Sequence, residues 1–130
     1  MEFALSEEQT MLANTLAHWA RSAYAFAKRR EYASLESVFE PNWAQLAELG
    51  ALGLNVPAAH GGLGGTPVET FIAMQVFGRV LLVEPFLQTA VVCAGLLSAA
   101  GNADQQAELL PEIVSGRRRL ALAEIGRAHV

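Results

Sequence analysis

Apolar residues recur at helical intervals along most of this 130-residue chain. In the first such segment Ser6 can cap the helix, and Gln9 stands at the N3 position of a capping box. Lys28 and the two arginines after it suit the negative end of a helix. The apolar residues of this segment share one helical face: Leu12, Leu16, Trp19, Ala23 and Phe26. The pattern therefore predicts a first amphipathic helix over residues 6–30. Residues 31–39 fit either a short helix or a loop.

Four further helical segments follow. The first opens at Pro41 and ends at Gly50, and the next covers residues 67–82. A strongly apolar helix opens at Pro85, and Asn102 caps the last one, in which Pro111 removes a backbone donor and can bend the helix. Residues 118–123 alternate only briefly, which is weak evidence for extended chain. The pattern as a whole predicts an all-α domain, a bundle of about five to six helices.

Between the second and third helical segments lies a glycine-rich loop. Four of the five residues at 61–65 are glycine. Thr66, Pro67 and Glu69 then occupy the N-cap, N1 and N3 positions of the next helix, so a capping box is expected. The loop lacks both the GK[ST] ending of a P-loop and the strand-linked GxGxxG pattern. We interpret it as a tight connection between helices.

Composition narrows the function classes. The chain is 52% hydrophobic, enough for a real core, and its net charge of −4 argues against a nucleic-acid partner. The arginine run at 117–119 is too short for a typical nucleic-acid site and is interpreted as a solvated hairpin or helix end. The single cysteine, Cys93, cannot form an internal disulfide and is expected to be a small buried residue. The apolar run 86–100 is too short for a membrane span, and no signal peptide is evident. A cytoplasmic location is the default expectation.

No catalytic constellation stands out in the sequence. His18, His60 and His129 are far apart, and none has a second metal-ligating residue three or four positions away. No metal site is therefore predicted. The residues themselves leave open whether the chain belongs to an enzyme, a helical interaction module or a helical scaffold.

Several longer segments resemble one enzyme family. They read LSEEQ at 5–9, LAELGALGLNVPAAHGGLGG at 46–65, AGNADQQAELLPEIVSG at 100–116 and LALAE at 120–124. Together, and in this spacing, they resemble the N-terminal α-helical domain of the acyl-CoA dehydrogenases. The segment VEPFLQT at 83–89 is most similar to the branch that contains pimeloyl-CoA dehydrogenase small subunits.

The resemblance implies an oxidoreductase that uses FAD. Such enzymes remove two hydrogens across the Cα–Cβ bond of an acyl-CoA thioester: a glutamate takes the α-proton and the flavin takes the β-hydride. Residues 1–117 would form the helical domain, and residues 118–124 would begin a middle β-domain. The resemblance places the base and most flavin contacts outside this chain, so no catalytic residue is assigned. It implies acyl-CoA, an electron-transfer acceptor and further dehydrogenase subunits, like or unlike, as partners.

The resemblance also nominates site residues. When positions are counted back from Ala100, those that line the acyl tail in the family correspond to Glu84, Gln88 and Val92. For each of these residues, an ordinary structural role is the alternative. Leu122 and Ala123 would contact the flavin. A threonine often stands at the second of these positions, whereas alanine offers no side-chain donor.

The final residues depart from the family pattern. Residues 125–130 match one reading frame of a common DNA-sequencing adapter, so we expect them to be an adapter artefact, with a natural short C-terminus as the alternative. The alternative function is a stand-alone, non-catalytic helical interaction module, which would have a closed surface. A dehydrogenase fragment would instead expose a contiguous apolar patch and have no turnover alone.

Overall fold

The computed structural model describes residues 4–28, 39–124 and 126. The α-helices with bounds inside these ranges are α1 (Glu7–Ala23), α3 (Phe39–Glu48), α4 (Pro67–Val80), α5 (Ala94–Ala100) and α6 (Ala103–Val114). Two 3₁₀ turns, η2 (Ala51–Gly53) and η3 (Ala58–His60), lie between α3 and α4. A π-helix, η4 (Leu87–Cys93), runs directly into α5. These ranges contain no strand, which confirms the all-α prediction.

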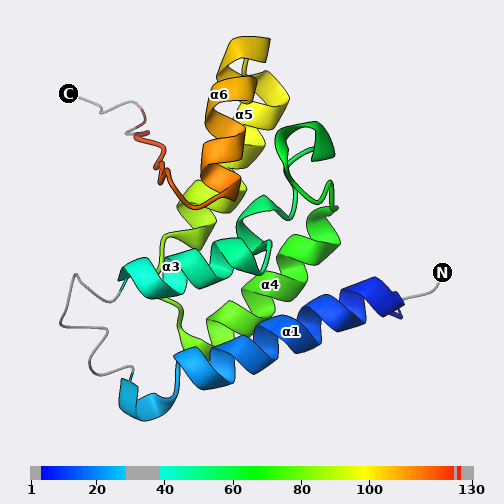
Figure 1. Cartoon of the computed structure of the whole chain (residues 1–130), viewed down its shortest axis with the longest axis vertical. Helices are drawn as coiled ribbons and strands as arrows, with labels where there is room; N and C mark the ends of the chain where they lie inside the picture. The colour runs from blue at the N-terminus through cyan, green and yellow to red at the C-terminus, as the bar shows by residue number, and fades with distance from the viewer. Residues whose placement is uncertain (1–3, 29–38, 125, 127–130) are drawn as a thin grey trace.

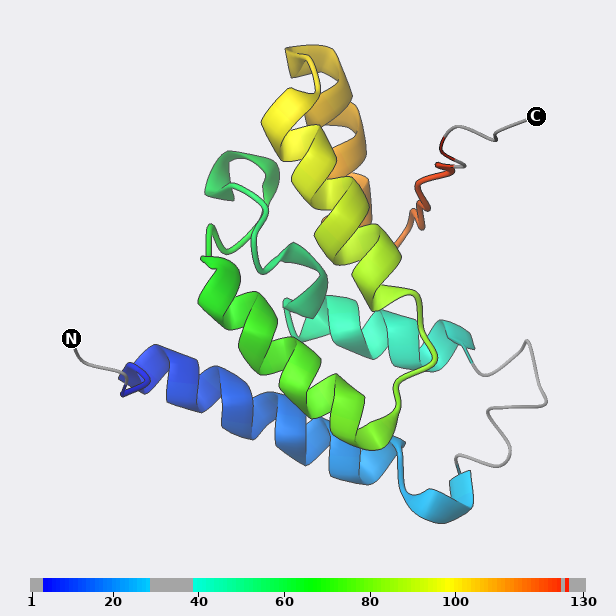
Figure 2. The same ribbon diagram turned by 180° about the vertical axis from the view of Figure 1, so that it is seen from behind.

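The helices form two packed groups. Figure 1 shows α1 and α4 side by side across the lower half of the molecule, and the contacts between these two helices are the most extensive. In the same view α5 and α6 stand as an upright pair at the top. Figure 2 shows from behind how η4 continues into α5 without a break. No helix of the described part is long and apolar enough to cross a membrane.

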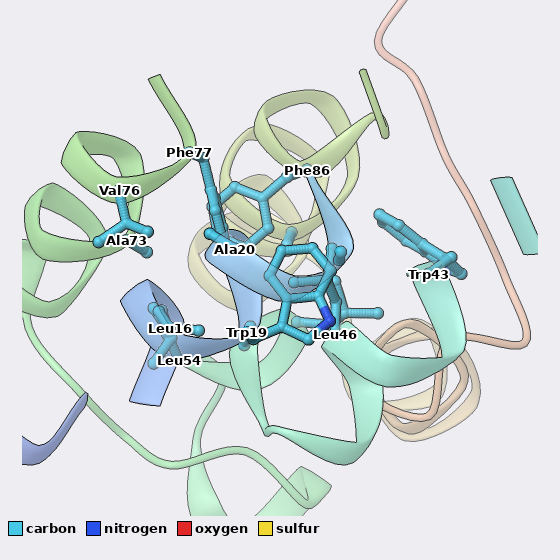
Figure 3. Packing of buried hydrophobic residues seen from close by; sticks show 14 of the residues in the cluster. Leu16, Trp19, Ala20, Trp43, Leu46, Leu54, Ala73, Val76, Phe77 and Phe86 are labelled. Atoms are coloured by element: carbon cyan, nitrogen blue, oxygen red, sulfur yellow. The ribbon is translucent and has the colours of Figure 1, made fainter. Parts of the chain in front are cut away.

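The main core lies where α1, α3 and α4 meet. Trp19 packs edge-on against Phe77, with ring centroids 6.1 Å apart, and Phe77 packs similarly against Phe86 at 4.8 Å. Leu16 and Leu46 are fully buried in the same cluster (Figure 3). Such edge-to-face aromatic packing adds to the free energy gained by burying the rings. A smaller cluster joins α6 to the rest of the chain, and its buried members are Val56, Ala94, Leu110 and Ile113.

Both predicted capping boxes at the α1 and α4 ends are present. Ser6 and Gln9 satisfy each other's backbone donors, and Thr66 and Glu69 do the same. Gln9 Nε2 also donates to Glu69 Oε1 over 2.7 Å, so the two helix starts are linked. Hydrogen bonds from Thr66 and Gln9 lower the pKa of Glu69 to about 2. The third box, formed by Asn102 and Gln105, begins α6.

The predicted end of the first helix was wrong. α1 stops at Ala23, and Tyr24 leaves the helical region with φ −111° and ψ 31°. The side chain of Tyr24 is 5% exposed, whereas Phe26 is 86% exposed and does not join the apolar face. The burial of Tyr24 therefore outweighs the continuing apolar pattern. Residues 29–38, which include Arg29, Arg30 and most of the segment left open above, lie outside the described residues.

The glycine-rich loop is a tight connection, as predicted. Gly61 has a φ of +84°, a conformation that favours glycine. At Gly62, an added Cβ would lie 2.0 Å from the carbonyl oxygen of Val56. The Gly64 and Gly65 amides donate to the carbonyls of Val56 and Leu54. The loop is thus pinned against the chain that precedes it.

Two other segments differ from the sequence pattern. The helix predicted from Pro85 begins with π geometry in η4, a feature that apolar periodicity does not predict. The described residues beyond α6, up to Glu124, form neither helix nor strand. A strand needs a neighbouring strand to hydrogen-bond with. The prediction that residues 118–124 begin a β-domain stays a prediction.

Candidate functional site

The best candidate site is a cavity of about 420 Å³ at the C-terminal end of α4. It lies between the last turns of that helix and the connection that leads into η4. Its lining is mainly apolar and comes from one continuous stretch of chain plus three residues of α4: Met74, Phe77, Gly78, Leu81, Leu82, Val83, Glu84, Pro85, Phe86, Leu87 and Gln88.

The cavity has a buried end and an open end. Phe77 and Phe86, at the buried end, are only 3% and 2% exposed. Leu81 and Leu87 are 56% and 43% exposed and lie at the mouth. An apolar chain that enters between the leucines would therefore be dehydrated progressively as it approaches the two aromatic rings.

The end of α4 shapes this cavity. Leu81 has a φ of +52°, and the amides of Leu81 and Leu82 donate to the carbonyls of Gly78 and Phe77. These two bonds are the pattern of a Schellman motif, in which glycine usually holds the left-handed position. The motif turns the chain sharply away from α4. The connection that follows can then close one side of the cavity.

A polar pair is buried at the inner end. The Tyr24 hydroxyl, from the C-terminus of α1, donates to Glu84 Oε2 and accepts from the Val83 amide over 3.3 Å. Glu84 is only 5% exposed. Burial raises the pKa of Tyr24 well above its usual range, and the hydrogen bond to Glu84 is the second cause of this rise. The side chain of Asn42, in α3, faces the same hydroxyl and acts on that pKa in the opposite direction.

The structure brings together two of the three acyl-site residues predicted from the sequence. Glu84 and Gln88 line the same cavity, the first at its buried end and the second exposed. Val92 is 39% exposed and is not part of this lining. The i, i+4 spacing of these positions assumes an α-helix, whereas the π-helix η4 bonds i to i+5 and rotates later residues away.

The predicted flavin contacts, Leu122 and Ala123, are both exposed and lie outside the cavity. The chain just before them is held by Thr89, a fully buried residue of η4. Its hydroxyl donates to the Leu120 carbonyl over 2.8 Å and accepts from the Leu120 amide at 3.2 Å. In the described part of the chain, the backbone amides of residues 121–124 have no protein partner.

The arginine side chains at 117–119 form ion pairs with acidic residues. Arg117 and Arg118 both pair with Glu112, and these contacts lower the pKa of that carboxyl. Arg119 pairs with Glu40, and its guanidinium lies 5.9 Å from the centre of the Trp43 ring. All three arginine side chains remain well exposed, as expected of a solvated hairpin or helix end.

Sequence reasoning missed Tyr24 and Thr89 as site residues. Their partners, Glu84 and Leu120, lie 60 and 31 positions away, so no local spacing could reveal either contact. The only available signal was a polar residue within an apolar run, and that signal pointed to Gln88 instead.

Comparison with known proteins identifies the family. Residues 6–117 match the model of the acyl-CoA dehydrogenase N-terminal domain. The chain is 31% identical over 126 residues to mitochondrial isovaleryl-CoA dehydrogenase from Pongo abelii, covering 92% of this chain and 29% of that protein. It is 36% identical over 112 residues to acyl-CoA dehydrogenase IpdE2 from Mycobacterium tuberculosis, covering 85% and 34% respectively.

A solved structure agrees. The ChsE4-ChsE5 complex from Mycobacterium tuberculosis is similar with a TM-score of 0.86 and 27% identity, covering 98% of this chain and 36% of that one. The chain thus spans about a third of the length of these relatives. Sequence and fold agree that this chain belongs to the acyl-CoA dehydrogenase family and carries its N-terminal domain.

Proposed function

We propose that this chain supplies the N-terminal domain of an FAD-dependent acyl-CoA dehydrogenase, which oxidises the Cα–Cβ bond of an acyl-CoA thioester. The family relationship supports this reaction class. In this proposal the chain contributes to substrate binding and subunit packing, and the base that takes the α-proton lies outside it. When bound, FAD supplies the hydride acceptor.

One observation carries the assignment to substrate binding: the apolar cavity at the end of α4. It has an open mouth and a buried aromatic end, as a site for a flexible acyl chain requires. Glu84 and Gln88, nominated from the sequence, both line it. Leu122 and Ala123 would meet the flavin through their backbone, since neither side chain can donate a hydrogen bond.

The remaining parts of the proposal concern partners. An electron-transfer acceptor would reoxidise the flavin, and the chain would assemble with like or unlike dehydrogenase subunits in the cytoplasm. The similarity to a protein solved as a complex supports assembly. Exposed large apolar residues of the described part, such as Phe71 and Leu96, would then pack against the rest of the enzyme.

Filling the cavity tests the proposal. Gly78 lines it, and a Cβ added there would meet nothing within 4 Å, so Gly78→Leu should narrow the cavity without disturbing the core. In the intact protein that carries this chain, the variant should raise KM for long acyl-CoA substrates much more than for short ones. Gly95→Leu is the matched control, because Gly95 is an exposed helical glycine with equal space that does not line the cavity.

The readouts are bleaching of the flavin by acyl-CoA under anaerobic conditions and KM across chain lengths. If KM depends on acyl-chain length equally in the two leucine variants, the cavity is not part of the acyl site. An intact protein that binds neither flavin nor acyl-CoA would overturn the enzyme proposal and favour the interaction module.

A further inference from the structure

The two carboxyl oxygens of Glu84 have different surroundings. Oε2 accepts the hydrogen bond from Tyr24. Within the described ranges no donor reaches Oε1, and Glu84 forms no ion pair. Glu84 also lines the cavity. The inner end of an apolar cavity therefore carries one hydrogen-bond acceptor that the described residues leave unused.

The neighbours of Glu84 hold the carboxyl group in this orientation. The Val83 amide donates to the Tyr24 oxygen, which directs the single hydroxyl proton toward Glu84 Oε2. Burial and the Glu84 contact keep the Tyr24 hydroxyl protonated, since both raise its pKa. The Tyr24 ring is itself packed against Trp19, with centroids 5.9 Å apart. These contacts restrict the rotation of the carboxyl group.

We propose that Glu84, positioned by Tyr24, makes this cavity selective for an acyl group that bears a hydroxyl near its far end. This inference rests on the proposed function, because it takes the acyl group to be the occupant. A ligand hydroxyl at the inner end donates to Oε1 while the rest of the chain contacts Phe77, Phe86 and the leucines at the mouth.

The energetic reason is the cost of an unused buried acceptor. A methyl-ended chain that reaches the same depth displaces solvent from Oε1 and offers no donor in return. A site built around a hydrogen bond to a hydroxyl discriminates strongly against the analogue that lacks it. A hydrophobic pocket alone distinguishes such analogues only weakly.

The test compares two ligand series on the intact protein that carries this chain. Each ω-hydroxyacyl-CoA is paired with the n-acyl-CoA of the same carbon number, and Kd is measured by the perturbation of the flavin spectrum or by calorimetry. The wild-type protein should prefer the hydroxylated ligand by about tenfold at one chain length, where the hydroxyl reaches Oε1. Shorter and longer pairs should show little preference.

Glu84→Met separates the acceptor from the shape of the cavity, because the methionine side chain has a similar length. Its thioether sulfur is only a weak acceptor and carries no donor, so the tenfold preference should fall to about twofold or less. Glu48→Met is the matched control, since Glu48 is an exposed residue of α3 outside the cavity, and it should keep the preference. An n-acyl-CoA affinity that is unchanged or higher in Glu84→Met shows that the variant is folded.

The outcomes separate the two proposals. A wild-type protein that binds both series equally at every length overturns the hydroxyl selectivity and leaves the acyl site standing. A preference that survives in Glu84→Met also overturns it. If neither series binds, the proposed function fails, and the selectivity fails with it.

Discussion

The two ends of α4 contrast in how they are specified. At the N-terminal end, Thr66, Pro67 and Glu69 build a capping box from residues three positions apart, and the glycines before it fix the approach of the chain. At the C-terminal end Leu81 holds a left-handed conformation that usually belongs to glycine, and the cavity beyond it depends on Tyr24 from another helix.

The contrast separates folding from function within one helix. The N-terminal end follows from local rules, and each residue there has the conformation it prefers. The C-terminal end contains an unfavourable backbone conformation and a buried carboxyl group, both of which cost stability. Departures from local preference of this kind are expected at sites that do chemistry or bind ligands.

The largest expected effect lies at the locally specified end. Gly62→Ala places a Cβ 2.0 Å from the Val56 carbonyl oxygen, so the loop must shift and lose its backbone hydrogen bonds. We expect a loss of about 3 kcal/mol in the free energy of unfolding, measured by urea denaturation. Gly95→Ala, in an exposed helical position with open space, should instead be neutral or stabilise by up to about 1 kcal/mol. Equal effects would show that the loop is not tightly packed.

The second effect concerns the buried pair. Tyr24→Phe keeps the ring that packs on Trp19 but removes the hydroxyl that donates to Glu84 Oε2. The variant should therefore lower the free energy of unfolding by about 2 kcal/mol. The double variant Tyr24→Phe/Glu84→Leu removes both partners and should recover much of this loss. The measurement is a double-mutant cycle in urea. A coupling energy near zero would mean that the pair contributes nothing to stability.

The third effect depends on pH. The pKa of Glu69 is about 2 in the folded chain against an ordinary value of 4.5, so its stabilising contribution is present above pH 4.5 and is lost as pH falls toward 2. Glu69→Gln should therefore be less stable than wild type by about 1 kcal/mol at pH 7. The difference should shrink through that window and vanish near pH 2. A difference that is constant with pH would contradict the assignment.

The smallest expected effect is an increase in stability. Leu81→Gly relieves the left-handed conformation at the end of α4, at the cost of greater freedom in the unfolded chain. The net effect should be a stabilisation of about 0.5 kcal/mol, seen as a small rise in Tm. Because Leu81 lines the cavity mouth, the same variant should weaken acyl-CoA binding. Destabilisation would show that the leucine side chain contributes more to packing than its exposure suggests.

The sequence predicts the helices better than the site. Capping boxes and glycine positions are local, so the starts of α1, α4 and α6 could be predicted from residues three apart. The end of α1 could not, because the burial of Tyr24 decides it. The resemblance nominated Glu84 and Gln88, but the partner of Glu84 and the π geometry of η4 depend on contacts across the fold. These contacts leave no periodic trace in the sequence.

The most direct test of the proposed acyl site is a crystal structure of the intact protein with a bound acyl-CoA thioester. We predict that the acyl carbons enter between Leu81 and Leu87 and end near Phe77, Phe86 and Glu84. An acyl chain bound elsewhere, with the cavity at the end of α4 left empty, would contradict it.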